Sequence, residues 1–172
     1  SLDDLNAIRG SKYVQSDTKY TYQEAKNALD NGKFVLYTGT PCQIAGLNSY
    51  LGKDYEKLLT IEVICHGVPS RKVFEMYKKE FMQQHNDDGK ILDINMRDKE
   101  QGWDITQRAI SVTTTTSEYS FNPADDSFRQ AFLANLSIND PCVNCKFNKL
   151  PRVADITMGD FWGVDDFDKS LN

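Results

Sequence analysis

Apolar residues along this chain follow the spacing of helices in some stretches and of short buried strands in others. Tyr22, Ala25 and Leu29 mark one face of a helix over 21–29, which ends at Asn31-Gly32. The further elements predicted in the first half are a strand at 34–37, a helix from 41 to 51, a strand at 58–64 and a helix at 71–84. This alternation of helices and strands is typical of a parallel α/β sheet.

The second half has a different pattern, with strands following one another directly. It predicts strands at 91–96, 105–112 and 119–121, a helix at 126–136 and a strand at 154–158. The polar turn near Thr116-Ser117 favours antiparallel pairing of the second and third of these strands. We therefore expect an α/β fold whose mixed sheet is parallel in its N-terminal half, with flanking helices, and antiparallel in part of its second half. No linker divides the sequence, so we expect one domain over 1–172.

Composition narrows the classes of function. The 172 residues include 25 acidic and 20 basic side chains, a net charge of −5, and no basic block suited to nucleic acid. No stretch approaches the ~20 apolar residues of a membrane span, and the first residues do not resemble a signal peptide. We expect a cytoplasmic protein that binds neither nucleic acid nor membrane.

Four cysteines are the unusual feature of this composition. Cys42 and Cys65 each follow a predicted strand, whereas Cys142 and Cys145 form a C-x-x-C. A cytoplasmic setting disfavours disulfides. The C-x-x-C favours metal binding, and its thiolates suit zinc and iron–sulfur centres equally well. Each lone cysteine can instead be a packed core thiol, and Cys42, in the first turn of a helix, can also be a reactive thiol.

Several other residues could take part in chemistry at the strand ends. His66 is either a proton donor or a structural histidine, and Arg97 either grips a phosphate or ends a hairpin. Gly159 and Gly163 would let the backbone approach a ligand, with Asp160 orienting it. Trp162 would stack on a planar cofactor or fill the core. The chain lacks G-x-G-x-x-G and the P-loop motif, which disfavours a standard nucleotide site.

Five motifs in order resemble the C-terminal domain of the coenzyme F420 hydrogenase/dehydrogenase beta-subunit family. They are GTPCQIAGL at 39–47, CHGVPS at 65–70, RDK at 97–99 with GW at 102–103, CVNCKF at 142–147 and DITMGDFWG at 155–163. The resemblance spans about residues 20 to 165. It implies an iron–sulfur flavoprotein module that passes electrons between a 4Fe–4S cluster and a flavin, FAD, and on to coenzyme F420 or another redox small molecule.

By this resemblance Cys42, Cys65, Cys142 and Cys145 are the cluster ligands, and the Gly39-Thr40 turn and the Gly159-to-Gly163 segment lie near the flavin. His66, a proton donor at a strand end, is the catalytic candidate. The candidate cofactor-binding residues are Gly39, Thr40, Arg97, Gly159, Asp160, Trp162 and Gly163. The expected partner is an electron-transfer subunit or an upstream ferredoxin-like domain, which the polar start without an initiator methionine also favours. The alternatives are a structural zinc protein, a thiol enzyme with Cys42 as nucleophile, and a non-catalytic accessory domain in surface-polysaccharide synthesis, a role that bacterial relatives suggest.

Overall fold

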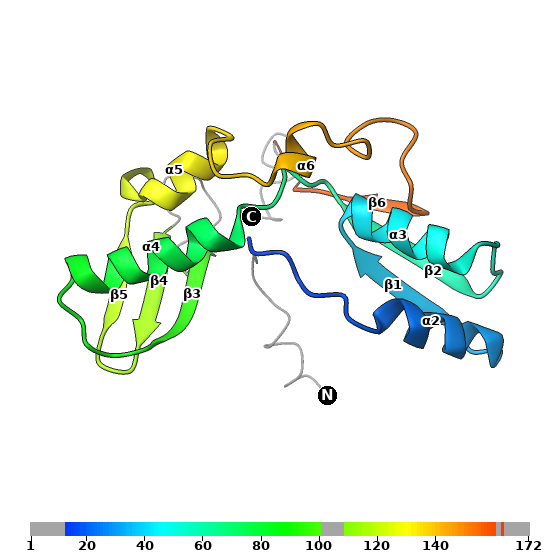
Figure 1. The fold of residues 1–172 in the computed structure, drawn as a ribbon, viewed down its shortest axis with the longest axis horizontal. Coiled ribbons are helices and arrows are strands. Elements are labelled where there is room, and N and C mark those ends of the chain that lie inside the picture. Colours follow the sequence, from blue (N-terminus) through cyan, green and yellow to red (C-terminus); the bar gives the residue numbers. More distant parts are fainter. Residues whose placement is uncertain (1–12, 101–108, 161–162, 164–172) are drawn as a thin grey trace. The chain divides into compact units, whose positions relative to one another are not determined.

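The strands of this protein form two separate three-stranded sheets (Figure 1). The computed structural model describes residues 13–100, 109–160 and 163. Two compact units divide the chain, and each contains one sheet. We call Ser16–Gly67 with Asn144–Val164 the parallel unit, and Ser1–Gln15, Val68–Val143 and Asp165–Asn172 the antiparallel unit.

The parallel unit is built from strands contributed by both ends of the sequence. Its strands β1 (Val35–Gly39), β2 (Leu58–Val63) and β6 (Ile156–Met158) lie in the order β1-β2-β6, and both pairings are parallel. Its helices are α2 (Thr21–Asp30) and α3 (Pro41–Leu51). Strand β2 is therefore central, and β6 joins the sheet after almost one hundred intervening residues.

One face of the parallel sheet is covered by the two helices. Their buried residues pack against alternate strand positions, and this core consists of Ala25, Leu29, Leu47 and Leu51 with Val35, Tyr37, Tyr55 and Leu58. The alternate positions Leu36, Val63 and Met158 belong to the opposite face. Their side chains are 58%, 46% and 54% exposed. Among the described residues, the parallel sheet thus has one covered apolar face and one open apolar face.

The antiparallel unit is a β-meander with helices. Strands β3 (Ile91–Asp98), β4 (Ala109–Thr114) and β5 (Glu118–Phe121) pair in sequence order. The helical elements are α4 (Arg71–Gln84), the 3-10 helix η1 (Pro123–Asp125), α5 (Ser127–Leu133) and the single turn α6 (Asp140–Val143). The core joins α4, α5 and the sheet through Tyr77, Phe81, Met96, Ile110, Val112 and Phe128.

The predicted fold class is confirmed, with its parallel and antiparallel strands in two sheets. Helix α4 has the predicted bounds, whereas α5 is shorter than the predicted 126–136. The backbone of Asn135 adopts the left-handed conformation, with φ of 60°, and so cannot continue the helix. Strand β4 begins at Ala109, and the predicted positions 105–108 lie outside the described residues. Helix α6 was not predicted.

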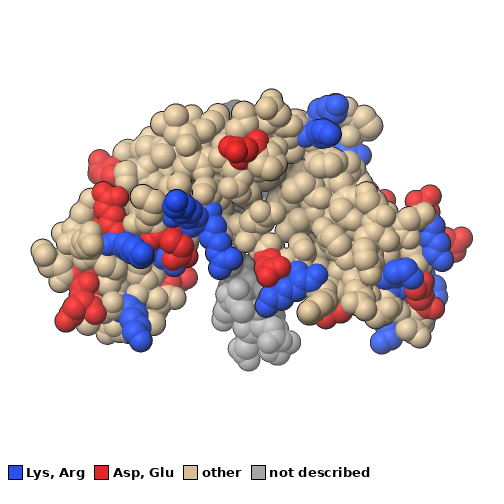
Figure 2. Space-filling model, viewed as in Figure 1, with Lys and Arg blue, Asp and Glu red and all other residues tan. Residues whose placement is uncertain are grey.

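Charged side chains of both signs are mixed on the surface of each unit, as the face in Figure 2 shows. Acidic and basic groups alternate along exposed helix faces, for example in the Lys26–Asp30 and Lys78–Glu75 pairs. Such pairs contribute little to stability, since solvent screens them.

Candidate functional site

The carboxyl ends of the three parallel strands meet at one edge of the sheet. Gly39 pairs with Glu62, and Val63 pairs with Met158, so β1, β2 and β6 end close to the same level. The residues that follow are Thr40 to Cys42, Cys65 to His66, and Gly159 to Asp160. Open α/β sheets bind ligands outside such an edge. We call these residues, with Gly39, the carboxyl edge; it contains seven of the predicted site residues: Gly39, Thr40, Cys42, Cys65, His66, Gly159 and Asp160.

Cys42 lies in the first turn of α3, which begins as the sequence predicts. Thr40 is the N-cap residue and Pro41 is the first helical residue. The side-chain oxygen Oε1 of Gln43 accepts a hydrogen bond of 2.9 Å from the backbone N–H of Thr40. The thiol of Cys42 is exposed, and its Sγ lies 3.2 Å from Oγ1 of Thr40. A helix N-terminus stabilises negative charge, so this position suits a bound anion.

The two glycines of the carboxyl edge leave room for neighbouring side chains. A Cβ atom on Gly39 would lie 2.9 Å from Oε1 of Gln43, the atom that caps α3. A Cβ atom on Gly159 would lie 2.8 Å from Cδ1 of Ile64. A side chain at either position would require the end of the neighbouring Gln43 or Ile64 side chain to shift. The assignment of both glycines to a flavin site stays a prediction.

A buried ion pair fastens the chain segment after the C-x-x-C to the central strand. Arg152 donates from Nε to Oε1 of Glu62, whose side chain is completely buried in β2. The hydroxyl of Thr157 donates to the same oxygen at 3.0 Å. The sequence analysis did not identify Glu62 as a candidate residue. Glu62 is the one acidic residue within the apolar run LLTIEVI, and a charged residue in such a strand indicates a buried, paired carboxylate.

Asp155 makes a second connection between this segment and β2. One oxygen of Asp155 accepts from the backbone N–H and from the hydroxyl of Thr60, at 2.8 and 2.7 Å. The backbone N–H of Asp155 donates back to the Thr60 hydroxyl at 3.0 Å. These hydrogen bonds from Thr60 lower the pKa of the Asp155 carboxyl. The residues just before β6 are thus tied to the centre of the sheet.

The other predicted site residues are distributed over both units. Arg97 lies on β3 of the antiparallel unit, and Cys142 lies on α6 of the same unit. Cys145 belongs to the parallel unit, and its side chain is partly buried. Gly163 has a φ of 91°, which favours glycine, whereas Trp162 lies outside the described residues.

No disulfide joins any of the four cysteines, all of which lie within the described residues. Within the described residues, no group of three or more His, Cys, Asp and Glu side chains is arranged to hold a metal ion. The chemistry of the donor set suits a thiolate-bound centre.

Comparison with protein families gives one decisive match. The family model that describes the C terminus of the beta subunit of coenzyme F420 hydrogenase/dehydrogenase matches residues 32–170. The chain belongs to this family. The match begins just before β1 and includes every strand of both sheets, the carboxyl edge and the C-x-x-C. Membership gives the protein a redox-related role.

No curated protein matches the chain. None of the helices in the described part of the chain combines the length and the apolar composition needed to cross a membrane.

Proposed function

We propose that this protein is an electron-transfer module of an oxidoreductase and that its redox cofactor binds at the carboxyl edge of the parallel sheet. The observation that carries the proposal is the convergence of three strand ends, with Cys42 and Cys65 following adjacent strands, in a chain of the F420 hydrogenase/dehydrogenase beta-subunit family. An open edge with two thiols is a suitable place for a redox centre rather than for a fold-stabilising bond.

The proposed ligands of a 4Fe–4S cluster are Cys42, Cys65, Cys142 and Cys145. Such a cluster, when bound, gains and loses single electrons. The N-terminus of α3 would favour the negative charge of a thiolate cluster next to Cys42. The Glu62–Arg152 pair would hold the segment that follows Cys145 against β2. In the cluster-bound protein, the C-x-x-C would complete the ligand set that Cys42 and Cys65 begin.

A flavin, FAD, is the second proposed cofactor, and it would relay electrons to a deazaflavin such as F420 or to another redox small molecule. The residues proposed to lie near it are Gly39, Thr40, Arg97, Gly159, Asp160, Trp162 and Gly163. His66, which is exposed at the end of β2, is the proposed proton donor. The proposed partner is an electron-transfer subunit or a ferredoxin-like domain, as in a multi-subunit redox enzyme.

Anaerobic reconstitution tests this proposal. Protein incubated with iron and sulfide should bind about four iron atoms per chain and give the broad visible absorption and EPR signal of a reduced 4Fe–4S cluster. The variants Cys42→Ser and Cys142→Ser should lose this signal. Val143→Ser is the matched control, since Val143 is exposed between the two cysteines of the C-x-x-C and is not a proposed ligand.

Metal analysis after the same reconstitution also distinguishes the cluster from a structural zinc site. Stoichiometric zinc without iron would show a structural metal site and contradict the cluster. Iron bound equally by wild type and by both the Cys42→Ser and the Cys142→Ser variant would show adventitious binding. FAD is tested separately by fluorescence titration, and a Gly159→Ala variant with unchanged flavin affinity would remove Gly159 from the flavin site.

A further inference from the structure

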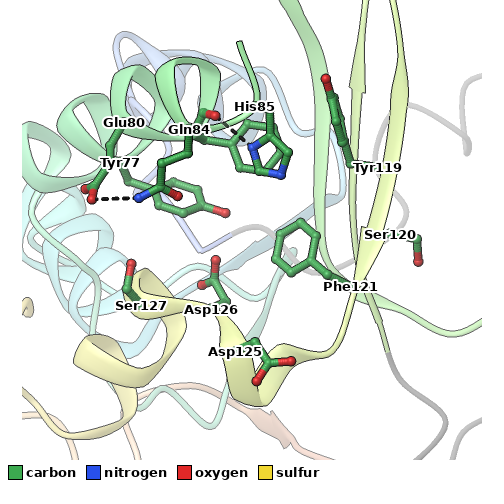
Figure 3. Close-up of a pocket in the computed structure, with 11 residues that line it drawn as sticks. Tyr77, Glu80, Gln84, His85, Tyr119, Ser120, Phe121, Asp125, Asp126 and Ser127 are labelled. Atoms are coloured by element: carbon green, nitrogen blue, oxygen red, sulfur yellow. Dashed lines mark hydrogen bonds between the residues drawn. The ribbon is translucent and has the colours of Figure 1, made fainter. Parts of the chain in front are cut away.

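The antiparallel unit contains a cavity to which the proposed redox function assigns no role. Its volume is about 300 Å³, and it lies between α4 and the segment that runs from β5 through η1 to the start of α5 (Figure 3). This volume is at the lower end of the range for small-molecule sites. All residues that line it belong to the antiparallel unit, so its shape depends on that unit alone.

Aromatic rings form the apolar wall of the cavity. The ring of Phe81 on α4 stacks on His85 with a centroid separation of 4.2 Å and on Phe121 with 5.9 Å. Tyr119 meets Phe81 edge-on at 5.2 Å. These rings pack on one another and together form a rigid aromatic wall. The faces of aromatic rings attract cations.

The polar part of the lining is acidic. Glu80, Asp125 and Asp126 supply three carboxylates, and no lysine or arginine lines the cavity among the described residues. Oδ1 of Asp126 accepts from the backbone N–H of Arg129 at 2.6 Å, which caps α5. A carboxylate offers about four acceptor positions, so Asp126 retains capacity for a further donor. A ligand with N–H groups and positive charge would satisfy this lining.

A buried hydroxyl lies beside the acidic part of the lining. Tyr77 is only 8% exposed, and the Asp126 carboxylate is the acceptor next to its hydroxyl. In Figure 3 the Tyr77 hydroxyl and the Asp126 carboxylate point toward the same space. Burial, and then the nearby Asp126 carboxylate, raise the pKa of Tyr77, so the hydroxyl stays protonated. A protonated hydroxyl that faces a carboxylate keeps its own oxygen available to accept an N–H from a ligand.

We propose that this cavity binds a small organic cation whose guanidinium or ammonium group donates to Asp126 and Asp125. The hydroxyl of Tyr77 accepts one N–H of the same head group, and the alkyl part of the ligand packs on Phe121. Glu80 adds negative charge at the rim. The carboxylates supply selectivity for positive charge, and the rings supply contact area.

Titration with matched four-carbon compounds tests this site. Butylguanidinium should bind the full chain saturably, with Kd in about the millimolar range by calorimetry, whereas 1-butanol and butyrate should not bind. In NMR spectra the amides of β5 should shift with butylguanidinium alone. Binding should weaken in added salt, since screening reduces attraction to the exposed carboxylates.

Single substitutions test which side chains of the cavity bind the cation. Asp125→Asn and Glu80→Gln remove charge from exposed side chains and should each weaken binding about fivefold. Tyr77→Phe should weaken binding by a similar factor, because it removes the hydroxyl oxygen that accepts an N–H of the head group. Asp93→Asn, which removes an exposed charge on β3 outside the cavity, is the control and should leave Kd unchanged.

Three results would overturn the proposal. One is the lack of saturable butylguanidinium binding up to about 20 mM, well above the expected Kd. Another is equal binding of 1-butanol, which would show a merely apolar cavity. The third is an unchanged Kd in both Asp125→Asn and Glu80→Gln. None of these outcomes depends on iron or flavin, so they test the cation site independently of the redox proposal.

Discussion

Arg152 donates to Glu62 across 90 residues of sequence, and this ion pair lies at the centre of the parallel sheet. The Glu62 side chain is fully buried, and the second oxygen of its carboxylate has no partner among the described residues. A charge in this position depends on its counter-charge, because desolvation is otherwise uncompensated. The pair therefore couples the stability of β2 to the position of the segment that carries Cys145.

Removing the arginine alone should be strongly destabilising. Arg152→Ala leaves the Glu62 carboxylate buried without its cation, and we expect a loss of about 3 kcal/mol in the free energy of unfolding of the parallel unit. Urea unfolding, followed separately in each unit by hydrogen exchange, measures this change. Lys149→Ala, an exposed cation in the same segment, is the control and should change stability by less than about 0.5 kcal/mol.

A double variant shows whether the loss of stability in Arg152→Ala comes from the unpaired charge or from lost packing. Glu62→Leu combined with Arg152→Met replaces both charges by apolar groups and should recover most of the lost stability. A double variant as unstable as Arg152→Ala would contradict the view that the cost arises from the uncompensated carboxylate.

Cys42 should be the most reactive of the four thiols. It is the exposed cysteine of the set, so reagents reach its sulfur most readily, and it lies in the first turn of the 11-residue helix α3. Under reducing conditions at neutral pH, iodoacetamide should label Cys42 before Cys65, Cys142 and Cys145. Peptide mass spectrometry over a time course measures the four rates. Uniform labelling of all four would contradict this order of reactivity.

Asp87 should make the antiparallel unit sensitive to acid. Hydrogen bonds from the Thr116 hydroxyl and the Gly89 backbone N–H, together with those from Tyr119 and Thr114, hold the pKa of Asp87 well below its usual range. A carboxyl whose pKa is lower in the folded state stabilises that state above its unfolded pKa. This stability is lost as pH falls toward the folded pKa.

The comparison of two asparagine variants tests this linkage. Asp87→Asn should lower the thermal midpoint at pH 7 and give a flatter dependence on pH in the acid range below about pH 4, where an unfolded aspartate titrates. Asp88→Asn, the exposed neighbour, should follow the wild-type curve. Parallel curves for wild type and Asp87→Asn would show that the hydrogen-bonded carboxylate does not contribute to acid sensitivity.

The sequence predicted the elements of this fold better than the contacts between distant segments. The regular spacing of Phe74, Tyr77 and Phe81 was sufficient for α4, and the alternation of helices and strands placed Cys42 and Cys65 at strand ends. The Glu62–Arg152 pair has no local pattern, because its partners come together only when β6 joins the sheet.

The spacing of apolar residues also could not predict the short elements. Helix α6 has four residues, too few to repeat an apolar face. Strand β6 was predicted from 154 but begins at Ile156, because Asp155 is engaged in hydrogen bonds with Thr60. The cavity could not be predicted either, since it brings α4 together with β5 and η1 through tertiary packing.

The two faces of the parallel sheet should respond differently to the loss of a leucine. Leu47 on α3 is fully buried against the covered face, so Leu47→Ala should reduce the free energy of unfolding by about 3 kcal/mol. Leu36 on β1 belongs to the open face and is 58% exposed, so Leu36→Ala should cost less than about 1 kcal/mol. Chemical denaturation of the two single variants measures both values. Parallel sheets usually have both faces covered, so a cost at Leu36 equal to that at Leu47 would contradict an open face and show that this face is buried in solution.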